Sequence, residues 1–316
     1  MNNIQEKTNQ WYASGEGDII AVWDQIDYLN RKLFGDYEPS IGPKPYFTSR
    51  LEKWLSNVSS SNEQLILFRL IPKLFYIGKS EFDTLYRIAF NTISTRWIID
   101  INDLKFDSQF DKNFIGLIDK VWFCPITDSM RINQFYHLNG INGPDKRPEW
   151  RSLKAFGSKD KIQAYIKKMQ FDNIVLLEDF VGSGNQIKEP IEFAANEFPN
   201  INFLVVPIVM CPKADSVVAE LEQKYKNVRV KPVIRLNSDS FIEEKKEDNK
   251  DDYFKSVHDI SNKYHPQMKK AGYKGHPLGF RKMGSLVVLH TNTPNNSLPL
   301  IWSSSDWYPI FNRHKR

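Results

Sequence analysis

Short continuous apolar runs, each followed by an amphipathic segment, fill the second part of this chain and constrain its fold more than any other feature. The runs are rich in Val, Ile and Leu, and they lie at 121–124, 174–177, 203–210, 228–233 and 286–289. Strands of this composition are usually buried on both faces. The segments between them, including 159–169, 187–198 and 214–226, have helical periodicity. This alternation predicts an α/β fold with a parallel sheet flanked by helices and joined by right-handed crossovers.

The first hundred residues have a different pattern. Apolar residues recur there at helical spacing, for example at Ile19, Val22 and Ile26, and further helices are expected at 49–58 and 80–99. We therefore predict a helical N-terminal region, 1–105, followed by an α/β domain, 106–316. Within the second domain, residues 243–252 read EEKKEDNKDD, and we expect a solvated charged excursion from the sheet near 240–272.

Composition narrows the environment in which the chain works. Its 43 Lys+Arg and 38 Asp+Glu give a net charge of +5, which permits a polyanionic partner without requiring one. Two cysteines exclude a disulfide framework and a Cys-rich zinc site, and the histidines show no metal-binding spacing, so we expect no metal site of the protein's own. The polar start lacks a signal-peptide core, and the longest apolar run, 203–211, has nine residues where a membrane span needs about 20. We expect a cytoplasmic protein with no membrane partner.

The segment most informative about chemistry is 173–187, which reads NIVLLEDFVGSGNQI. An apolar strand runs into Glu178 and Asp179, and a loop of Gly182, Ser183, Gly184, Asn185 and Gln186 then leads into a helix. Ligands of open parallel sheets bind beyond the carboxyl ends of the strands, which is where this segment lies. Glycines permit close backbone approach, and a helix N-terminus favours anions. Carboxylates repel a bare phosphate but suit vicinal hydroxyls or a hydrated divalent cation. A loop that binds a 5′-phosphate beside carboxylates that bind ribose hydroxyls predicts a cradle for ribose 5-phosphate.

The same segment resembles the phosphoribosyl-pyrophosphate signature of type I phosphoribosyltransferases. In that resemblance Glu178 and Asp179 correspond to the acidic pair that contacts the ribose, and the loop 182–186 corresponds to the 5′-phosphate loop. The family usually continues the loop with Gly and Thr, whereas this chain has Asn185 and Gln186. The resemblance implies a type I phosphoribosyltransferase-like sheet.

The segment has two other interpretations. The stretch FVGSGN also resembles the Gly-rich loop of amino-methyltransferases that act on DNA. However, Asp179 stands where that family has Pro, and the chain has no Asn/Asp-Pro-Pro-aromatic motif. The second is an ordinary Gly-containing turn with exposed acids.

A wider resemblance covers most of residues 115–316. The stretches VWFCPITDSMRINQF and SLVVLHTNTPNNSLPLIWSSSDWYPIF are similar to a phosphoribosyltransferase-like family of bacterial conflict systems, PRTase-CE. Within this family the chain is similar to retron-associated effectors. That resemblance implies an anti-phage role, toxicity when the chain is released, and partners that include a reverse transcriptase with its DNA and a winged-helix protein.

The loop 126–131 follows the first predicted strand of the sheet. In type I enzymes this loop approaches the diphosphate, so the resemblance assigns pyrophosphate binding to Ser129 and Arg131. Helix capping by Asp128 and Ser129 is the alternative. The basic segment 146–151 stands where type I enzymes carry a mobile catalytic loop.

Together these features imply ribosyl transfer from phosphoribosyl pyrophosphate (PRPP), or N-glycosidic hydrolysis of a nucleotide, with Glu178 and Asp179 as catalytic residues and Mg²⁺ carried by the substrate. The alternative is a catalytically inactive nucleotide-binding sensor or assembly subunit of a reverse transcriptase–DNA complex.

Overall fold

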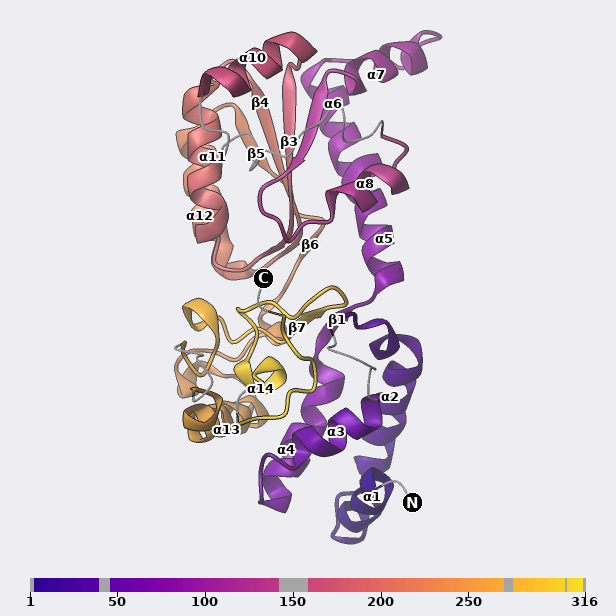
Figure 1. The fold of residues 1–316 in the computed structure, drawn as a ribbon, viewed down its shortest axis with the longest axis vertical. Helices are drawn as coiled ribbons and strands as arrows, with labels where there is room; N and C mark the ends of the chain where they lie inside the picture. The colour runs from indigo at the N-terminus through magenta and orange to yellow at the C-terminus, as the bar shows by residue number, and fades with distance from the viewer. Residues whose placement is uncertain (1–2, 40–45, 142–158, 270–274, 305, 315–316) are drawn as a thin grey trace. The chain divides into compact units, whose positions relative to one another are not determined.

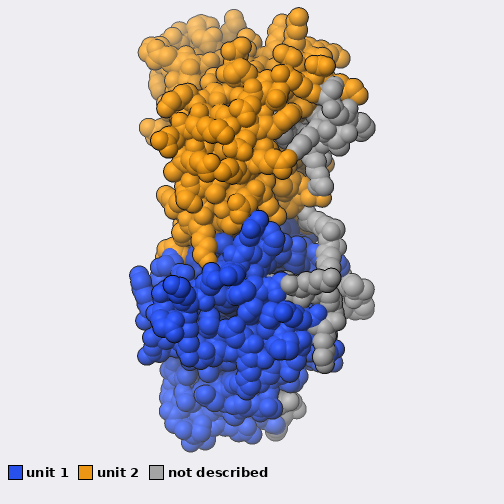
Figure 2. Space-filling view, turned by 90° about the vertical axis from the view of Figure 1, so that its left-hand side faces the viewer, with its two compact units in different colours: residues 1–79, 238–316 blue, residues 80–237 orange. Residues whose placement is uncertain are grey.

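The computed structural model describes residues 3–39, 46–141, 159–269, 275–304 and 306–314. The chain forms two compact units, which Figure 2 distinguishes by colour. Unit 1 consists of residues 1–79 together with 238–316, and unit 2 consists of residues 80–237. Unit 2 is therefore continuous in sequence, whereas unit 1 is assembled from two distant segments.

Unit 2 is built on a parallel sheet, which confirms the predicted α/β class. Its strands are β2 (Val121–Pro125), β3 (Asn173–Val181), β4 (Asn202–Met210), β5 (Val228–Val230) and β6 (Ile234–Arg235). They follow the order β2-β3-β4-β5, and β6 also pairs with β4. In register, Trp122 lies beside Ile174, Ile174 beside Phe203, and Phe203 beside Val228. Every residue of β3 is buried, as expected for a central strand covered on both faces.

Helices cover both faces of this sheet (Figure 1). On one face lie α10 (Lys159–Met169), α11 (Asn185–Glu197) and α12 (Asp215–Lys224). On the other lie α5 (Lys79–Ile88), the π-helical turn η3 (Ala89–Ser94), α6 (Thr95–Ile101), α7 (Phe110–Ile118) and α8 (Ile132–Leu138). Ile174 and Leu176 pack with Ile191 and Leu221 in the first core. On the second face, the Phe123 ring lies 5.5 Å from that of Phe90.

Unit 1 is mostly helical. Its N-terminal part contains α1 (Asn3–Ala13), α2 (Ile19–Lys32), η1 (Phe34–Asp36), α3 (Phe47–Leu55), α4 (Ser61–Leu70), η2 (Ile71–Lys73) and β1 (Phe75–Ile77). Its C-terminal part contains η6 (Ser238–Ser240), η7 (Lys246–Asp248), α13 (Asp252–Lys269), η8 (Phe280–Lys282), β7 (Val287–Leu289) and α14 (Pro299–Trp302). The parallel pair β1 and β7 joins the two parts, with Phe75 beside Val287. One core unites them, since Trp54 and Phe68 are fully buried in the same cluster as Leu300 and Phe311.

The structure refines several of the sequence-based expectations. The strand expected at 286–289 forms, but it pairs with β1 in unit 1 and not with the main sheet. Of the run 228–233, only 228–230 forms a strand, β5, and β6 begins directly after the run. The charged excursion contains the buried Asn249 and leads into the unpredicted helix α13. The helical stretch 1–105 contributes to both compact units, so the units do not coincide with a boundary at residue 105.

None of the helices in the described ranges combines the length and the apolar character needed to cross a membrane.

Candidate functional site

Glu178 and Asp179 lie near the carboxyl end of β3. The strand continues through them to Val181, four residues beyond the predicted strand end, and Glu178 lies beside Pro207 of β4. Both side chains are buried, with 3% and 7% of their surface exposed. Burying carboxylates is costly unless hydrogen bonds compensate for the lost water, so their partners determine the character of the site.

The partners come from the loop that follows β2. The Thr127 amide donates to Glu178 Oε2 at 3.0 Å, and the Thr127 hydroxyl donates to Oε1 at 2.6 Å. The Ser129 hydroxyl lies 3.0 Å from Glu178 Oε1 and 2.7 Å from Asp179 Oδ1. The two hydroxyl oxygens are 2.8 Å apart. The loop after β2 and the acids on β3 are thus brought together, as the parallel pairing of the two strands predicts.

The hydrogen count of this cluster favours a proton on Glu178. Thr127 and Ser129 each carry one hydroxyl hydrogen, yet their oxygens make the four contacts given above. If Ser129 donates to Asp179, its contact with Glu178 Oε1 needs another donor, and a protonated Glu178 provides one. In agreement, burial and the neighbouring charge of Asp179 raise the pKa of Glu178 to about 8, although the bonds that Thr127 donates oppose the rise.

This raised pKa predicts a pH-dependent stability. Between the unfolded pKa near 4.5 and the folded value near 8, the folded chain binds more protons, so its stability is greatest below this range and is lost as the pH rises through it. We expect the free energy of unfolding in urea to fall between pH 5 and pH 8.5 by an amount on the order of a few kcal/mol. Glu178→Gln should remove this part of the slope. Glu81→Gln, at an exposed position of α5, should retain it, and an unchanged slope in Glu178→Gln would contradict the assignment.

The predicted phosphate loop lies directly beyond the acids, at the start of α11. Gly182 and Gly184 are buried, whereas Asn185 and Gln186 are exposed. Gly184 precedes the helix with φ +80°, in the left-handed region that favours glycine. The first turn of α11 contains no acidic residue, so its positive dipole end favours an anion. A phosphate role for residues 182–186 fits this geometry and stays a prediction.

Arg131 lies at the start of α8, at the end of the Thr127–Ser129 loop. Burial and the charge of Asp179 move the pKa of Tyr86, on α5, above its ordinary value. The Arg131 backbone, which donates to the phenol oxygen, and the Arg131 charge oppose this rise. Tyr86 is therefore within electrostatic range of both Asp179 and Arg131. The role of Ser129 and Arg131 in pyrophosphate binding is not tested by these contacts and stays a prediction.

Comparison with known proteins agrees with this geometry. A family model described as PRTase-CE matches residues 51–313, which is most of the chain and includes every predicted site residue. The chain belongs to the PRTase-CE family. A search of curated proteins and a search of solved structures found no match. Family membership makes the chain a phosphoribosyltransferase-like protein.

Two residues near the acidic pair could not be assigned from the sequence. Thr127 lies in the loop that the sequence selected, but nothing in the loop showed that its hydroxyl and amide would both bind Glu178. Tyr86 lies on a helix with apolar periodicity, and each aromatic residue of such a helix is expected to belong to the hydrophobic core. The basic segment 146–151, proposed as a catalytic loop, lies outside the described residues.

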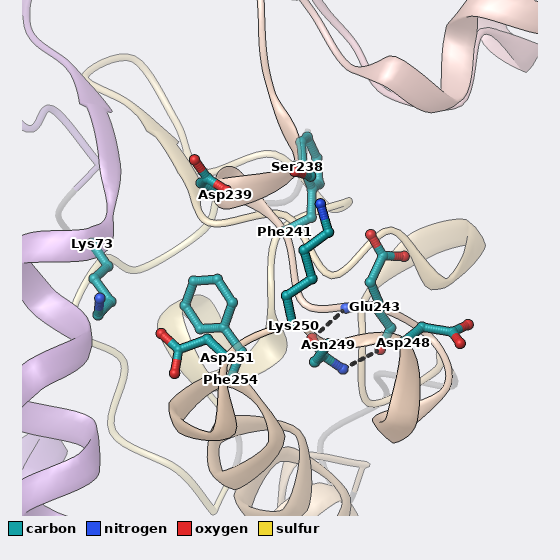
Figure 3. A pocket seen from close by; sticks show the side chains of 10 residues that line it. All are labelled: Lys73, Ser238, Asp239, Phe241, Glu243, Asp248, Asn249, Lys250, Asp251 and Phe254. Carbon is teal, nitrogen blue, oxygen red and sulfur yellow. Dashed lines mark hydrogen bonds between the residues drawn. The ribbon is translucent and has the colours of Figure 1, made fainter.

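A separate cavity of about 440 Å³ lies within unit 1. Figure 3 shows its lining, formed by Lys73, Ser238, Asp239, Phe241, Glu243, Asp248, Asn249, Lys250, Asp251 and Phe254. Asn249 shapes one wall, because its side chain accepts from the Glu243 amide at 2.9 Å and donates to the Lys246 carbonyl at 3.2 Å. None of the predicted site residues lines this cavity. Most of the lining belongs to the charged excursion, which therefore forms ordered structure that the sequence did not predict.

Proposed function

We propose that this protein binds PRPP or a nucleotide at the carboxyl end of β3 and acts on its ribose phosphate, by ribosyl transfer or by N-glycosidic hydrolysis. The observation that carries the proposal is the arrangement of Glu178 and Asp179, two adjacent buried carboxylates that precede the glycine-rich start of α11. Carboxylates suit sugar hydroxyls, and a helix N-terminus suits a phosphate.

In the proposed reaction the bond between ribose C1′ and its leaving group breaks, and an oxocarbenium-like ribose forms. Asp179 orients the ribose hydroxyls and offsets the positive charge of the ribose. Glu178, in its protonated form, both donates hydrogen bonds to these hydroxyls and accepts them. The loop 182–186 holds the 5′-phosphate, and Ser129 and Arg131 receive the departing diphosphate.

Mg²⁺ would reach the site bound to the diphosphate of the substrate. Glu178 and Asp179 supply oxygen atoms, the ligand type that Mg²⁺ prefers. If water attacks C1′, a nucleotide yields free base and ribose 5-phosphate, which would deplete a nucleotide pool.

The biological role that we propose is anti-phage defence in the cytoplasm. Family membership supports it, together with the resemblance to retron-associated effectors. In this proposal a reverse transcriptase with its DNA, and a winged-helix protein, restrain the chain until infection releases its toxicity.

A second candidate function is nucleotide sensing without turnover, as an assembly subunit of the reverse transcriptase complex. Asn185 and Gln186 favour it, because they replace the usual Gly and Thr of the phosphate loop.

A nucleotide-pool profile separates these functions. Cells that express the chain without partners should lose one class of nucleotide within the period in which growth stops, and purified chain should release pyrophosphate or free base from the same compound. Calorimetric binding without turnover, also in the presence of partners, would support the sensor. Failure to bind any ribose 5-phosphate compound would contradict both functions.

A further inference from the structure

The hydroxyl groups of Thr127 and Ser129 form a closely spaced pair on the acidic site. Their oxygens are 2.8 Å apart, and each is in hydrogen-bond contact with a carboxylate. Ser129 contacts both acids, whereas Thr127 contacts Glu178 alone. The acids are thus bonded to two neighbouring hydroxyl groups of the chain itself.

A ribose ring presents the same chemical pattern. The 2- and 3-hydroxyls of ribose are vicinal, and two staggered oxygens on adjacent carbons lie at a hydrogen-bond-like separation. We propose that Thr127 and Ser129 occupy the subsite of the ribose diol in the free protein, so that a ribose phosphate binds by displacing them. This inference rests on the proposed function. It adds that the two hydroxyl groups of the protein compete with the ligand for the acids.

The local structure allows the exchange without opening the loop. The Ile126 amide is bonded to the Leu177 carbonyl at 2.8 Å, which fixes the start of the loop on β3. The Thr127 amide bonds to Glu178 Oε2, whereas its hydroxyl bonds to Oε1. Rotation about χ1 of Thr127 and Ser129 can therefore remove both hydroxyls and leave the backbone contact in place.

A consequence is selectivity for ribose over 2-deoxyribose. A ribose ligand replaces the two displaced hydroxyl groups of Thr127 and Ser129 with two of its own. A deoxyribose ligand supplies only one. One buried carboxylate then lacks a hydrogen-bond donor, and this lowers the affinity for the deoxyribose ligand. The wild-type protein should bind ribose 5-phosphate at least about ten-fold more tightly than 2-deoxyribose 5-phosphate.

The test removes the competitor while keeping the shape of the loop. Calorimetry should show Thr127→Val/Ser129→Ala binding ribose 5-phosphate about ten-fold more tightly than wild type, because the ligand no longer displaces internal hydrogen bonds. Thr127→Ser keeps the hydroxyl, so it should not gain the affinity that the double variant gains. Inorganic phosphate lacks the diol, so its affinity should not show this ten-fold gain in the double variant.

Each outcome has a distinct meaning. Unchanged or weaker ribose 5-phosphate binding by the double variant, with binding by wild type, would overturn the internal competitor and leave the proposed function standing. Absence of binding by wild type and all variants would overturn the proposed function itself. Thr84→Val, which removes an exposed hydroxyl of α5 bonded to the Ser80 carbonyl, is the matched control for folding. If the double variant does not fold, the single variants Thr127→Val and Ser129→Ala should each bind about three-fold more tightly, and unchanged binding by both would overturn the inference.

Discussion

Replacing Asp179 by Asn should reduce the affinity for ribose 5-phosphate, and any turnover, by about 100-fold, since hydrogen bonds to a charged group contribute roughly 1.5–3 kcal/mol each. The negative charge of Asp179 raises the pKa of both Glu178 and Tyr86, so Glu178 is the member of the pair expected to hold a proton. Glu178→Gln should cost less at pH 7, about ten-fold, because the amide resembles a protonated carboxyl group.

The measurements are calorimetry with ribose 5-phosphate and assays of pyrophosphate and free base. Asp172→Asn is a matched control, since this acid precedes the same strand but its side chain is 66% exposed and its ion pair with Lys120 is weak. It should behave as wild type. The catalytic assignment would be wrong if the combined Glu178→Gln/Asp179→Asn variant kept its toxicity or turnover.

Gly184→Ala should destabilise unit 2 by about 2–4 kcal/mol and weaken phosphate binding. An added Cβ would lie 2.9 Å from Val217 Cβ on α12, and φ at this position is +80°. Both the backbone conformation and the packing of the loop on α12 therefore require glycine. Relieving either the backbone strain or the clash with Val217 requires a movement of the turn. This turn positions the first amides of α11.

Urea unfolding and calorimetry with inorganic phosphate measure the two effects. Gly116→Ala is a suitable control, because an added Cβ on α7 would meet no atom within 4 Å and alanine favours a helix by up to about 1 kcal/mol. Val217→Ala removes two further contacts at 3.2 Å and should partly restore stability to Gly184→Ala. Equal stabilities for Gly184→Ala and wild type would show that the loop is not constrained in this way.

The main sheet could be predicted because its strands are continuous apolar runs of Val, Ile and Leu, a local property that reflects burial on both faces. The acids and the loop 182–186 could be located because they directly follow one such strand. The pairing of β1 with β7 could not be predicted, since it joins residues more than 200 positions apart and β1 has only three residues. Tyr86 and Thr127 reach the site through tertiary packing, and helical or loop patterns carry no trace of such contacts.

The assembly of unit 1 from both ends of the chain has a consequence for biosynthesis. Domains tend to fold as units during translation, N-terminal ones first. Here β1 leaves the ribosome early but must wait for β7, whereas residues 80–237 hold all the strands of the main sheet. The nascent chain should therefore acquire a protease-resistant unit 2 before its first helices find their final core, and pulse proteolysis of stalled chains would reveal that order.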